Sequence, residues 1–147
     1  MSADLLCEFT DRPQAADLDT VDAGLHLFNI NAVDLDAVQT RACFARNAAG
    51  QVVGGLRARQ WGTAVEVQQL WVDEPLRRQG VARRLMQALE DEVRRRGATL
   101  IYLDTFSFQA RGFYERCGFE VAVRLGGMPD GIEKYVMLKR LDDAADR

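Results

Sequence analysis

The sequence is poor in the residues that hold metal ions and form disulfides. It has one histidine, His26, and three cysteines that lie far apart, Cys7, Cys43 and Cys117. This spacing excludes a C-x-x-C redox pair and argues against a metal site. An odd number of scattered cysteines indicates a protein of a reducing, intracellular compartment.

Long apolar runs are missing as well. No stretch approaches the roughly 20 apolar residues of a membrane span, and the N-terminus carries acidic residues where a signal peptide has its apolar core. Internal repeats and low-complexity tracts are also absent. We therefore expect a cytoplasmic protein with no membrane partner, and a chain of 147 residues has the size of one domain with a real core.

Charge is spread unevenly along the chain, although the formal net charge is only −3. Residues 1–40 hold eight acidic side chains against Arg12 alone, a net of −7. Residues 75–97 hold seven arginines against three acidic side chains, a net of +4. A ligand with an anionic end, which would bind the basic region, and a cationic partner, which would bind the acidic region, would suit this pattern. Two solvated helix faces would explain the same pattern.

The apolar periodicity predicts an α+β domain. The expected helices cover residues 13–39, 79–96 and 108–117, the second ending at Gly97. The expected strands cover residues 4–9, 40–47, 51–60, 63–72, 98–105, 119–125 and 132–141. Because a helix between two extended segments implies a crossover and parallel pairing, we expect a central mixed, largely antiparallel twisted sheet flanked by helices.

Arginines crowd around one glycine at the expected start of the second helix, in the stretch LRRQGVARRL of residues 76–85. A helix N-terminus offers unpaired N–H groups and the positive end of the helix dipole. A glycine there lets an anion approach the backbone, and guanidinium groups add charge and forked donors. The spacing Arg77-x-x-Gly80-x-Ala82 therefore predicts a pyrophosphate site, although the P-loop G-x-x-x-x-G-K-S/T and the dinucleotide-binding G-x-G-x-x-G are absent.

The strand before this helix changes phase. Val65 and Val67 alternate, but the next apolar residues are Leu70 and Val72, so the pattern slips by one position across residues 68–69. One extra residue is what a β-bulge inserts, and a strand that ends near Gln69 would give the same pattern. A bulge would leave backbone groups unpaired, where an extended, amide-bearing ligand could bind.

Together these segments resemble the GNAT superfamily of N-acetyltransferases. The strand EVQQLWV followed by RRQGVARRL is similar to the family's acetyl-CoA motif, Q/R-x-x-G-x-G/A, and FQARGFYERCGFE is similar to its second motif. The resemblance covers about residues 60–140. It implies a single N-acetyltransferase domain over 1–147, with residues 1–60 forming the acceptor wall, 61–141 the acetyl-CoA-binding and catalytic part, and 142–147 a tail.

The resemblance also implies the roles of individual residues. Tyr114 matches the tyrosine that protonates the departing CoA thiolate, and Ser107 stands where asparagine is common, so that its hydroxyl would have to replace the amide contact to the cofactor. No acyl-enzyme is expected, which makes Cys117 a packed thiol. The pantetheine arm would bind backbone groups of Leu70, Trp71 and Val72. The pyrophosphate would bind Arg77, Arg78, Gln79, Gly80, Val81, Ala82 and Arg83.

The base that takes the proton of the acceptor is less well defined. An alkylammonium group has a pKa near ~10 and must lose a proton before attack. Glu66 lies on the strand expected over residues 63–72, at a position where some members of the family hold a catalytic glutamate. A solvated glutamate with a water chain as the base is the alternative, and His26 is a second candidate.

The sequence as a whole predicts a cytoplasmic N-acetyltransferase that uses acetyl-CoA as co-substrate, without a metal, on a small-molecule or peptide amine. The acceptor is expected to be cationic, because Asp22, Asp34 and Asp36 lie in the region that forms the acceptor wall in the family. A CoA-binding or acyl-CoA-binding regulatory module without turnover is the alternative, against which Tyr114 argues. Nucleic acid is not an expected partner, since the chain is acidic and no aromatic residues accompany the arginines, and a homodimer is left open.

Overall fold

The computed structural model describes residues 4–142, and the chain divides into an N-terminal unit up to Asp36 and a sheet unit from Ala37 onward. The N-terminal unit consists of helix α1 (Ala15–Ala32), which is followed by a 3-10 turn, Leu35–Ala37. None of the residues of α1 is buried. The helical segments predicted over 13–39 are therefore confirmed.

The strand predicted near residues 4–9 is wrong, because residues 4–10 have no regular secondary structure. Leu5, Cys7 and Phe9 alternate as strand residues do, and all three are exposed. A strand is held by hydrogen bonds to a neighbouring strand. A local pattern cannot supply that partner, so the alternation alone was not sufficient evidence.

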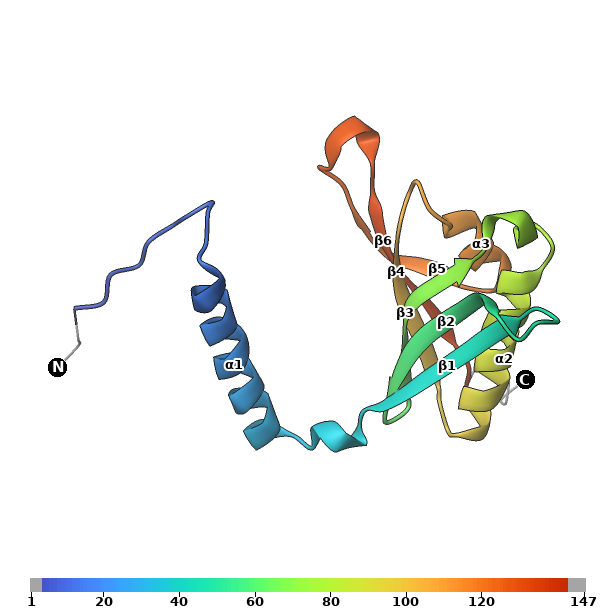
Figure 1. The fold of residues 1–147 in the computed structure, drawn as a ribbon, viewed down its shortest axis with the longest axis horizontal. Coiled ribbons are helices and arrows are strands. Elements are labelled where there is room, and N and C mark those ends of the chain that lie inside the picture. The colour runs from blue at the N-terminus through green and yellow to red at the C-terminus, as the bar shows by residue number, and fades with distance from the viewer. Residues whose placement is uncertain (1–3, 143–147) are drawn as a thin grey trace. The chain divides into compact units, whose positions relative to one another are not determined.

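The sheet unit contains one six-stranded sheet in the order β1-β2-β3-β4-β6-β5 (Figure 1). Only β3 and β4 are parallel, and the four other strand pairs are antiparallel. The strands are β1 (Gln39–Arg46), β2 (Val52–Trp61), β3 (Ala64–Val72), β4 (Leu100–Phe106), β5 (Glu120–Leu125) and β6 (Lys134–Arg140). This mixed, largely antiparallel sheet confirms the predicted α+β fold class.

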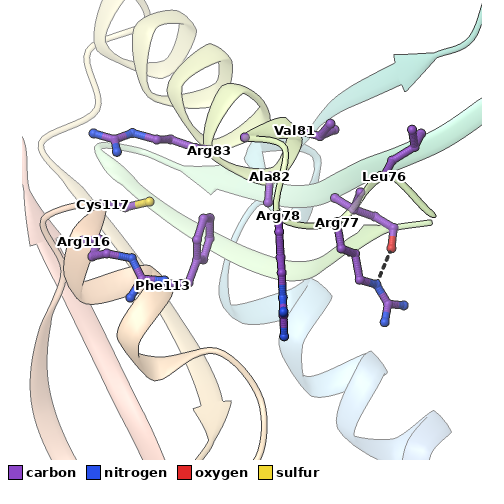
Figure 2. Close-up of a pocket in the computed structure, with 11 residues that line it drawn as sticks. Leu76, Arg77, Arg78, Val81, Ala82, Arg83, Phe113, Arg116 and Cys117 are labelled. Atoms are coloured by element: carbon purple, nitrogen blue, oxygen red, sulfur yellow. Dashed lines mark hydrogen bonds between the residues drawn. The ribbon is translucent and has the colours of Figure 1, made fainter. Parts of the chain in front are cut away.

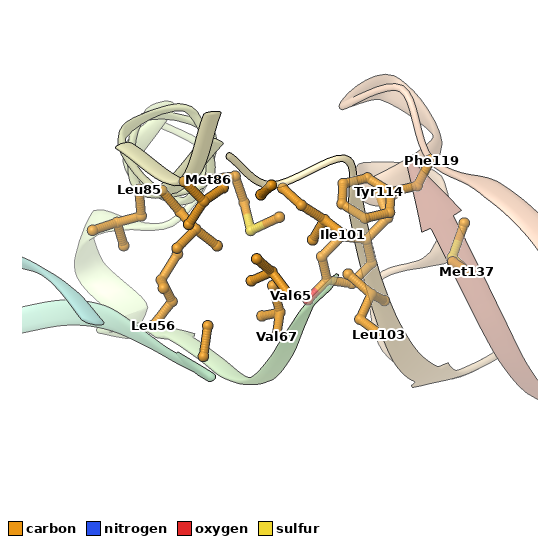
Figure 3. Close-up of a cluster of buried hydrophobic side chains, with 14 of the residues drawn as sticks. Leu56, Val65, Val67, Leu85, Met86, Ile101, Leu103, Tyr114, Phe119 and Met137 are labelled. Atoms are coloured by element: carbon orange, nitrogen blue, oxygen red, sulfur yellow. The ribbon is translucent and has the colours of Figure 1, made fainter. Parts of the chain in front are cut away.

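Helix α2 (Val81–Arg95) makes the crossover from β3 to β4. It packs against β1, β2 and β3 on one face of the sheet, because its apolar residues recur every three or four positions. Figure 3 shows Leu85 and Met86 of α2 over Val65 and Val67 of β3, with Tyr114 of the short helix α3 (Arg111–Arg116) beside β4. The core of the domain lies between these helices and the sheet.

The phase slip in β3 is a β-bulge. Arg57 of β2 pairs with Gln69 and Ala58 pairs with Val67, so Gln68 is the extra residue. The parallel pairing with β4 extends only from Ala64 to Val67. Beyond Val67 the backbone of β3 has no strand partner on its β4 side, and the two strands part.

A nearly buried carboxylate joins three elements on the helix-covered side of the sheet. Glu90 of α2 accepts from Arg94 Nη2 at 2.9 Å and from Lys139 Nζ of β6 at 2.7 Å. The same ammonium group donates to the carbonyl oxygen of Cys117, the residue after α3, at 2.8 Å. A carboxylate with so little solvent is stable only with such partners, so these contacts hold α2, α3 and β6 together.

Candidate active site

Four arginines line a pocket between the start of α2 and α3, which we call the arginine pocket. It has a volume of about 300 Å³. Figure 2 shows Arg77 and Arg78 in the loop before α2 (Val81–Arg95), Arg83 in α2 itself and Arg116 in α3. The pocket is lined by Val72, Leu76, Arg77, Arg78, Gly80, Val81, Ala82, Arg83, Phe113, Arg116 and Cys117.

The backbone of α2 adds donors to this pocket. The helix begins at Val81, and the N–H of Arg84 is the one that reaches the Gly80 carbonyl, at 3.0 Å. The N–H groups of Val81, Ala82 and Arg83 therefore have no carbonyl partner one turn back. The first turn contains no acidic residue, so the positive end of the helix dipole faces the pocket without compensation.

The loop before α2 is held in an unusual conformation. Arg78 has φ 63° and Gly80 has φ 82°, both in the left-handed region, and this costs about 1 kcal/mol or more for arginine. Two side chains fasten the loop, since Arg77 Nε donates to the Val72 carbonyl at 2.9 Å (Figure 2) and Gln79 Nε2 donates to that of Pro75 at 3.0 Å. A Cβ at Gly80 would meet no atom within 4 Å. The space above the glycine is therefore open to an anion.

A second pocket lies where β3 and β4 part, and we call it the wedge pocket. It has a volume of about 530 Å³. Its walls come from the bulged half of β3, from the end of β4 and from the loop and helix that follow β4. The lining residues are Val67, Gln68, Gln69, Leu70, Trp71, Asp104, Thr105, Gln109, Ala110 and Tyr114.

Tyr114 supplies a protonated phenol to the wedge pocket. Its ring makes edge contacts with Phe113 and Phe119, at centroid distances of 5.2 Å and 5.9 Å. Burial raises the pKa of Tyr114 to about 12, so the hydroxyl keeps its proton throughout the physiological range. Within residues 4–142 the hydroxyl has no hydrogen-bond partner, and it can donate to a group that enters the pocket.

The two candidate bases lie outside both pockets. Glu66 forms an ion pair with Arg59, whose Nη2 lies 3.3 Å from Glu66 Oε2. Burial raises the pKa of Tyr102, and a hydrogen bond from Tyr102 to the Glu66 carboxylate raises it further. His26 is exposed on α1 in the N-terminal unit. By contrast, Asp104 lines the wedge pocket, and it is a carboxylate that the sequence analysis did not single out.

Ser107 is engaged elsewhere. Its hydroxyl accepts from the Glu133 N–H at 3.0 Å and its own N–H donates to the Glu133 carbonyl at 2.8 Å. The serine thus ties the end of β4 to the segment before β6. Gln109 lines the wedge pocket instead, where its side-chain oxygen accepts from the Phe106 N–H at 2.9 Å.

Two further residues of the arginine pocket were missed by the sequence analysis, Phe113 and Arg116. They are three positions apart on α3 and therefore lie on the same face of that helix. This spacing could have identified them from the sequence. Cys117 also lines this pocket. Burial raises the pKa of its thiol, which leaves little thiolate at neutral pH and agrees with a packed thiol.

Comparisons with known proteins identify the family of this chain. The model of the acetyltransferase (GNAT) family matches residues 7–119, and the chain belongs to that family. It is 33% identical over 113 residues to the blasticidin-S acetyltransferase of Streptomyces morookaense, a match that covers 76% of this chain and 81% of that protein.

Solved structures agree on the fold. An acetyltransferase from Bacillus cereus superposes with a TM-score of 0.73 at 23% identity, over 91% of this chain and 98% of the other. A Bacillus anthracis protein in complex with acetyl coenzyme A gives a TM-score of 0.61 at 21% identity, over 70% of this chain and 63% of the other. At these identities the likeness shows the fold alone.

Other classes of site find no support in the part of the chain that the structure describes. No group of three or more histidine, cysteine, aspartate or glutamate side chains there could hold a metal ion. No helix among the same residues is both long and apolar enough to cross a bilayer.

The open space at Gly80 leads to a first prediction. We expect acetyl-CoA to raise the melting temperature by mass action and Gly80→Leu to abolish that rise, because the leucine side chain would fill the space in which we expect the pyrophosphate to bind. Loss of even one charge-assisted hydrogen bond weakens binding by about tenfold or more. Thermal melts with and without acetyl-CoA measure the effect.

Gly50 provides the matched control. It has φ 79°, close to the 82° of Gly80, and a Cβ there would also meet nothing within 4 Å. Gly50→Leu should therefore cause similar backbone strain and leave the rise in melting temperature intact. An acetyl-CoA response that survives in Gly80→Leu, or disappears equally in both variants, would contradict an anion site at Gly80.

Tyr114 leads to a second prediction. Tyr114→Phe keeps the ring and removes a hydroxyl without a partner, so the melting temperature should hold while kcat falls by about 10²-fold. We expect the protonated phenol to be the proton donor, and with a pKa of about 12 it keeps its proton below the upper end of the accessible pH range. The kcat of the unmodified protein should therefore not decline between neutral pH and about pH 10. Steady-state kinetics across pH measure both effects.

Tyr135 is the control for this substitution, because it is a second buried tyrosine whose hydroxyl donates to Glu133 rather than into the wedge pocket. Tyr135→Phe should retain kcat. Full activity of Tyr114→Phe would show that solvent protonates the leaving group.

Proposed function

We propose that this protein is an acetyl-CoA-dependent N-acetyltransferase that acts on a primary amine. The observation that carries the proposal is the position of a protonated phenol, Tyr114, in a gap of the sheet close to a helix start that arginines surround. A module that only bound CoA would need the helix start but not the phenol.

The residues present fit acetyl-CoA. The pyrophosphate would be held by the N–H groups of Val81, Ala82 and Arg83 and by the surrounding guanidinium groups, and Arg116 would add a fourth positive charge. The pantetheine arm would bind the unpaired β4 side of β3, at residues 70–72. When bound, the co-substrate supplies an acetyl group activated as a thioester.

The protein's own residues then handle two protons. The acceptor nitrogen must lose one before it forms a bond to the acetyl carbon, and a carboxylate or a water chain is needed to receive it. The carboxylates that we propose for this role are Asp104, which lines the wedge pocket, and Glu66, which would act through water. As the carbon–sulfur bond breaks, the Tyr114 hydroxyl donates to the sulfur, so that charge does not build up there.

The third prediction tests turnover itself. Thiol release from acetyl-CoA should require an amine, and a panel should include polyamines, aminoglycosides, amino acids, basic peptides and blasticidin S, since the relative from Streptomyces is named for that compound. We expect at least one class to give release that the Tyr114→Phe variant loses. Acetyl-CoA binding without release for any class would indicate the CoA-binding module instead.

We further propose that the acceptor carries positive charge besides the reacting amine. The N-terminal region is rich in carboxylates, and the resemblance to the family implies that this region forms a wall of the acceptor cleft. Carboxylates along such a wall raise the local concentration of cations. Asp34 also accepts from the Asp36 N–H at 3.0 Å, a contact that an asparagine side-chain oxygen would preserve.

The fourth prediction follows from this charge. Asp34→Asn and Asp36→Asn should each raise KM for a polycationic acceptor by about two- to fivefold and change KM for a monoamine less. The kcat/KM for the polycation should fall as salt shortens the Debye length from about 30 Å to about 3 Å. Kinetics that ignore both the salt and the substitutions, or a preference for an anionic acceptor, would show that the acidic region is only a solvated surface.

A further inference from the structure

The arginine pocket holds more positive charge than one pyrophosphate neutralises. Arg77, Arg78, Arg83 and Arg116 line it, and no acidic residue lines it with them. Among residues 37–142 none of these four guanidinium groups forms an ion pair, and the one hydrogen bond that they donate runs from Arg77 to the Val72 carbonyl. A pyrophosphate diester carries about one negative charge on each phosphate, so half of the positive charge is left for another anionic group.

The four side chains fall into two pairs. In Figure 2 the guanidinium groups of Arg77 and Arg78 lie on one side of the Phe113 ring, and those of Arg83 and Arg116 lie on the other. Arg77 and Arg78 belong to the loop that leads to the helix start, where the unpaired N–H groups are. Arg83 belongs to α2 and Arg116 to α3, so the second pair joins two helices across the pocket.

Cys117 lies where the second pair converges. Burial raises the pKa of its thiol, and the positive charges of Arg83, Lys139 and Arg116 act against that rise. Both guanidinium groups are therefore near the same sulfur atom. The charge of Lys139 is already neutralised, because its Nζ lies 2.7 Å from Glu90 Oε2, which leaves the two arginines to attract a ligand.

The backbone that carries this pair is held in place before any ligand binds. Lys139 Nζ donates to the Cys117 carbonyl at 2.8 Å and to Glu90 of α2 at 2.7 Å. The end of α3, next to Arg116, is thereby fastened to the helix that carries Arg83. An anion that binds between two preorganised donors pays less of the ordering cost of binding.

The charge of the second pair suits a phosphate monoester. Such a group carries about −1.5 to −2 at neutral pH and has three strong acceptor oxygens. Two guanidinium forks that come from different helices can each bond to these oxygens. CoA has a monoester of this kind, the 3′-phosphate of its ribose, on the nucleotide that also carries the pyrophosphate. Its phosphates together carry about four negative charges, which matches the four arginines.

We propose that Arg83 and Arg116 form a second anion subsite of the arginine pocket, which binds the 3′-phosphate of CoA and so selects CoA over dephospho-CoA. The proposal rests on the proposed function, since it concerns the co-substrate of the same site. Arg83 contributes its backbone N–H to the pyrophosphate and its side chain to the 3′-phosphate, and the Phe113 ring separates the two positions.

Calorimetric titration with CoA and with dephospho-CoA tests the subsite, because the two ligands differ only in the 3′-phosphate. CoA should bind about tenfold more tightly or better, which is the effect of one charge-assisted hydrogen bond or more. Arg116→Met keeps an unbranched side chain and removes the charge. It should weaken CoA binding by about the same factor and leave dephospho-CoA binding unchanged, and Arg83→Met should act in the same direction.

Arg84→Met is the matched control. Arg84 is the neighbour of Arg83 on α2 and carries the same charge, but it does not line the arginine pocket, so this variant should keep the preference for CoA. Arg78→Met removes a charge from the loop pair instead, and it should weaken the binding of both ligands to a similar extent.

The titration needs no amine and no transfer, so it separates the subsite from the reaction. A preference for CoA that Arg116→Met abolishes supports the subsite even if no amine is acetylated, in which case the proposed function fails and the subsite stands. Equal affinity for the two ligands, or binding of neither, would overturn the proposal. A preference that Arg84→Met reduces as much as Arg116→Met does would also overturn it, because that result would show only a general attraction of anions.

Discussion

The structure depends on the point at which β3 leaves β4. Four residue pairs hold the two strands in parallel, and the bulge at Gln68 then turns β3 away. Ordinary sheet pairing would satisfy the backbone groups beyond Val67 and leave no space for a ligand. Because the strands part, polar backbone, a phenol and a carboxylate face one cavity inside an otherwise close-packed domain.

The arginine pocket follows from the same departure. Beyond the divergence, β3 leads into the loop that places Gly80 at the start of α2. Helix α3 lies beside β4 and brings Arg116 to the opposite wall of the arginine pocket. Four guanidinium groups therefore surround one pocket, in a protein of net charge −3.

Much of this arrangement could be predicted from the sequence. The phase slip in the apolar alternation indicated the bulge and the periodicity indicated the fold class, and the structure confirms both. Glycine and arginine at a helix start are local signals too, and the anion site that they indicate stays a prediction. The strand expected near residues 4–9 failed because strands depend on partners. Asp104 and Gln109 were missed because their importance comes from which elements meet in space, whereas Arg116 shares a helix face with Phe113, a local signal that was overlooked. Ser107 looked like a cofactor ligand by position, but its hydroxyl bonds to the Glu133 backbone.

The ammonium group of Lys139 has a consequence for how this site can vary. It binds Glu90 of α2 and the carbonyl at the end of α3 at the same time, and those two helices carry the opposite walls of the arginine pocket. The spacing of the two helices thus depends in part on a lysine of β6, a strand that contributes no side chain to the pocket. In related chains, a change at position 139 should be accompanied by a compensating change on α2 or α3, so that the residues that keep the pocket's dimensions are inherited as a group.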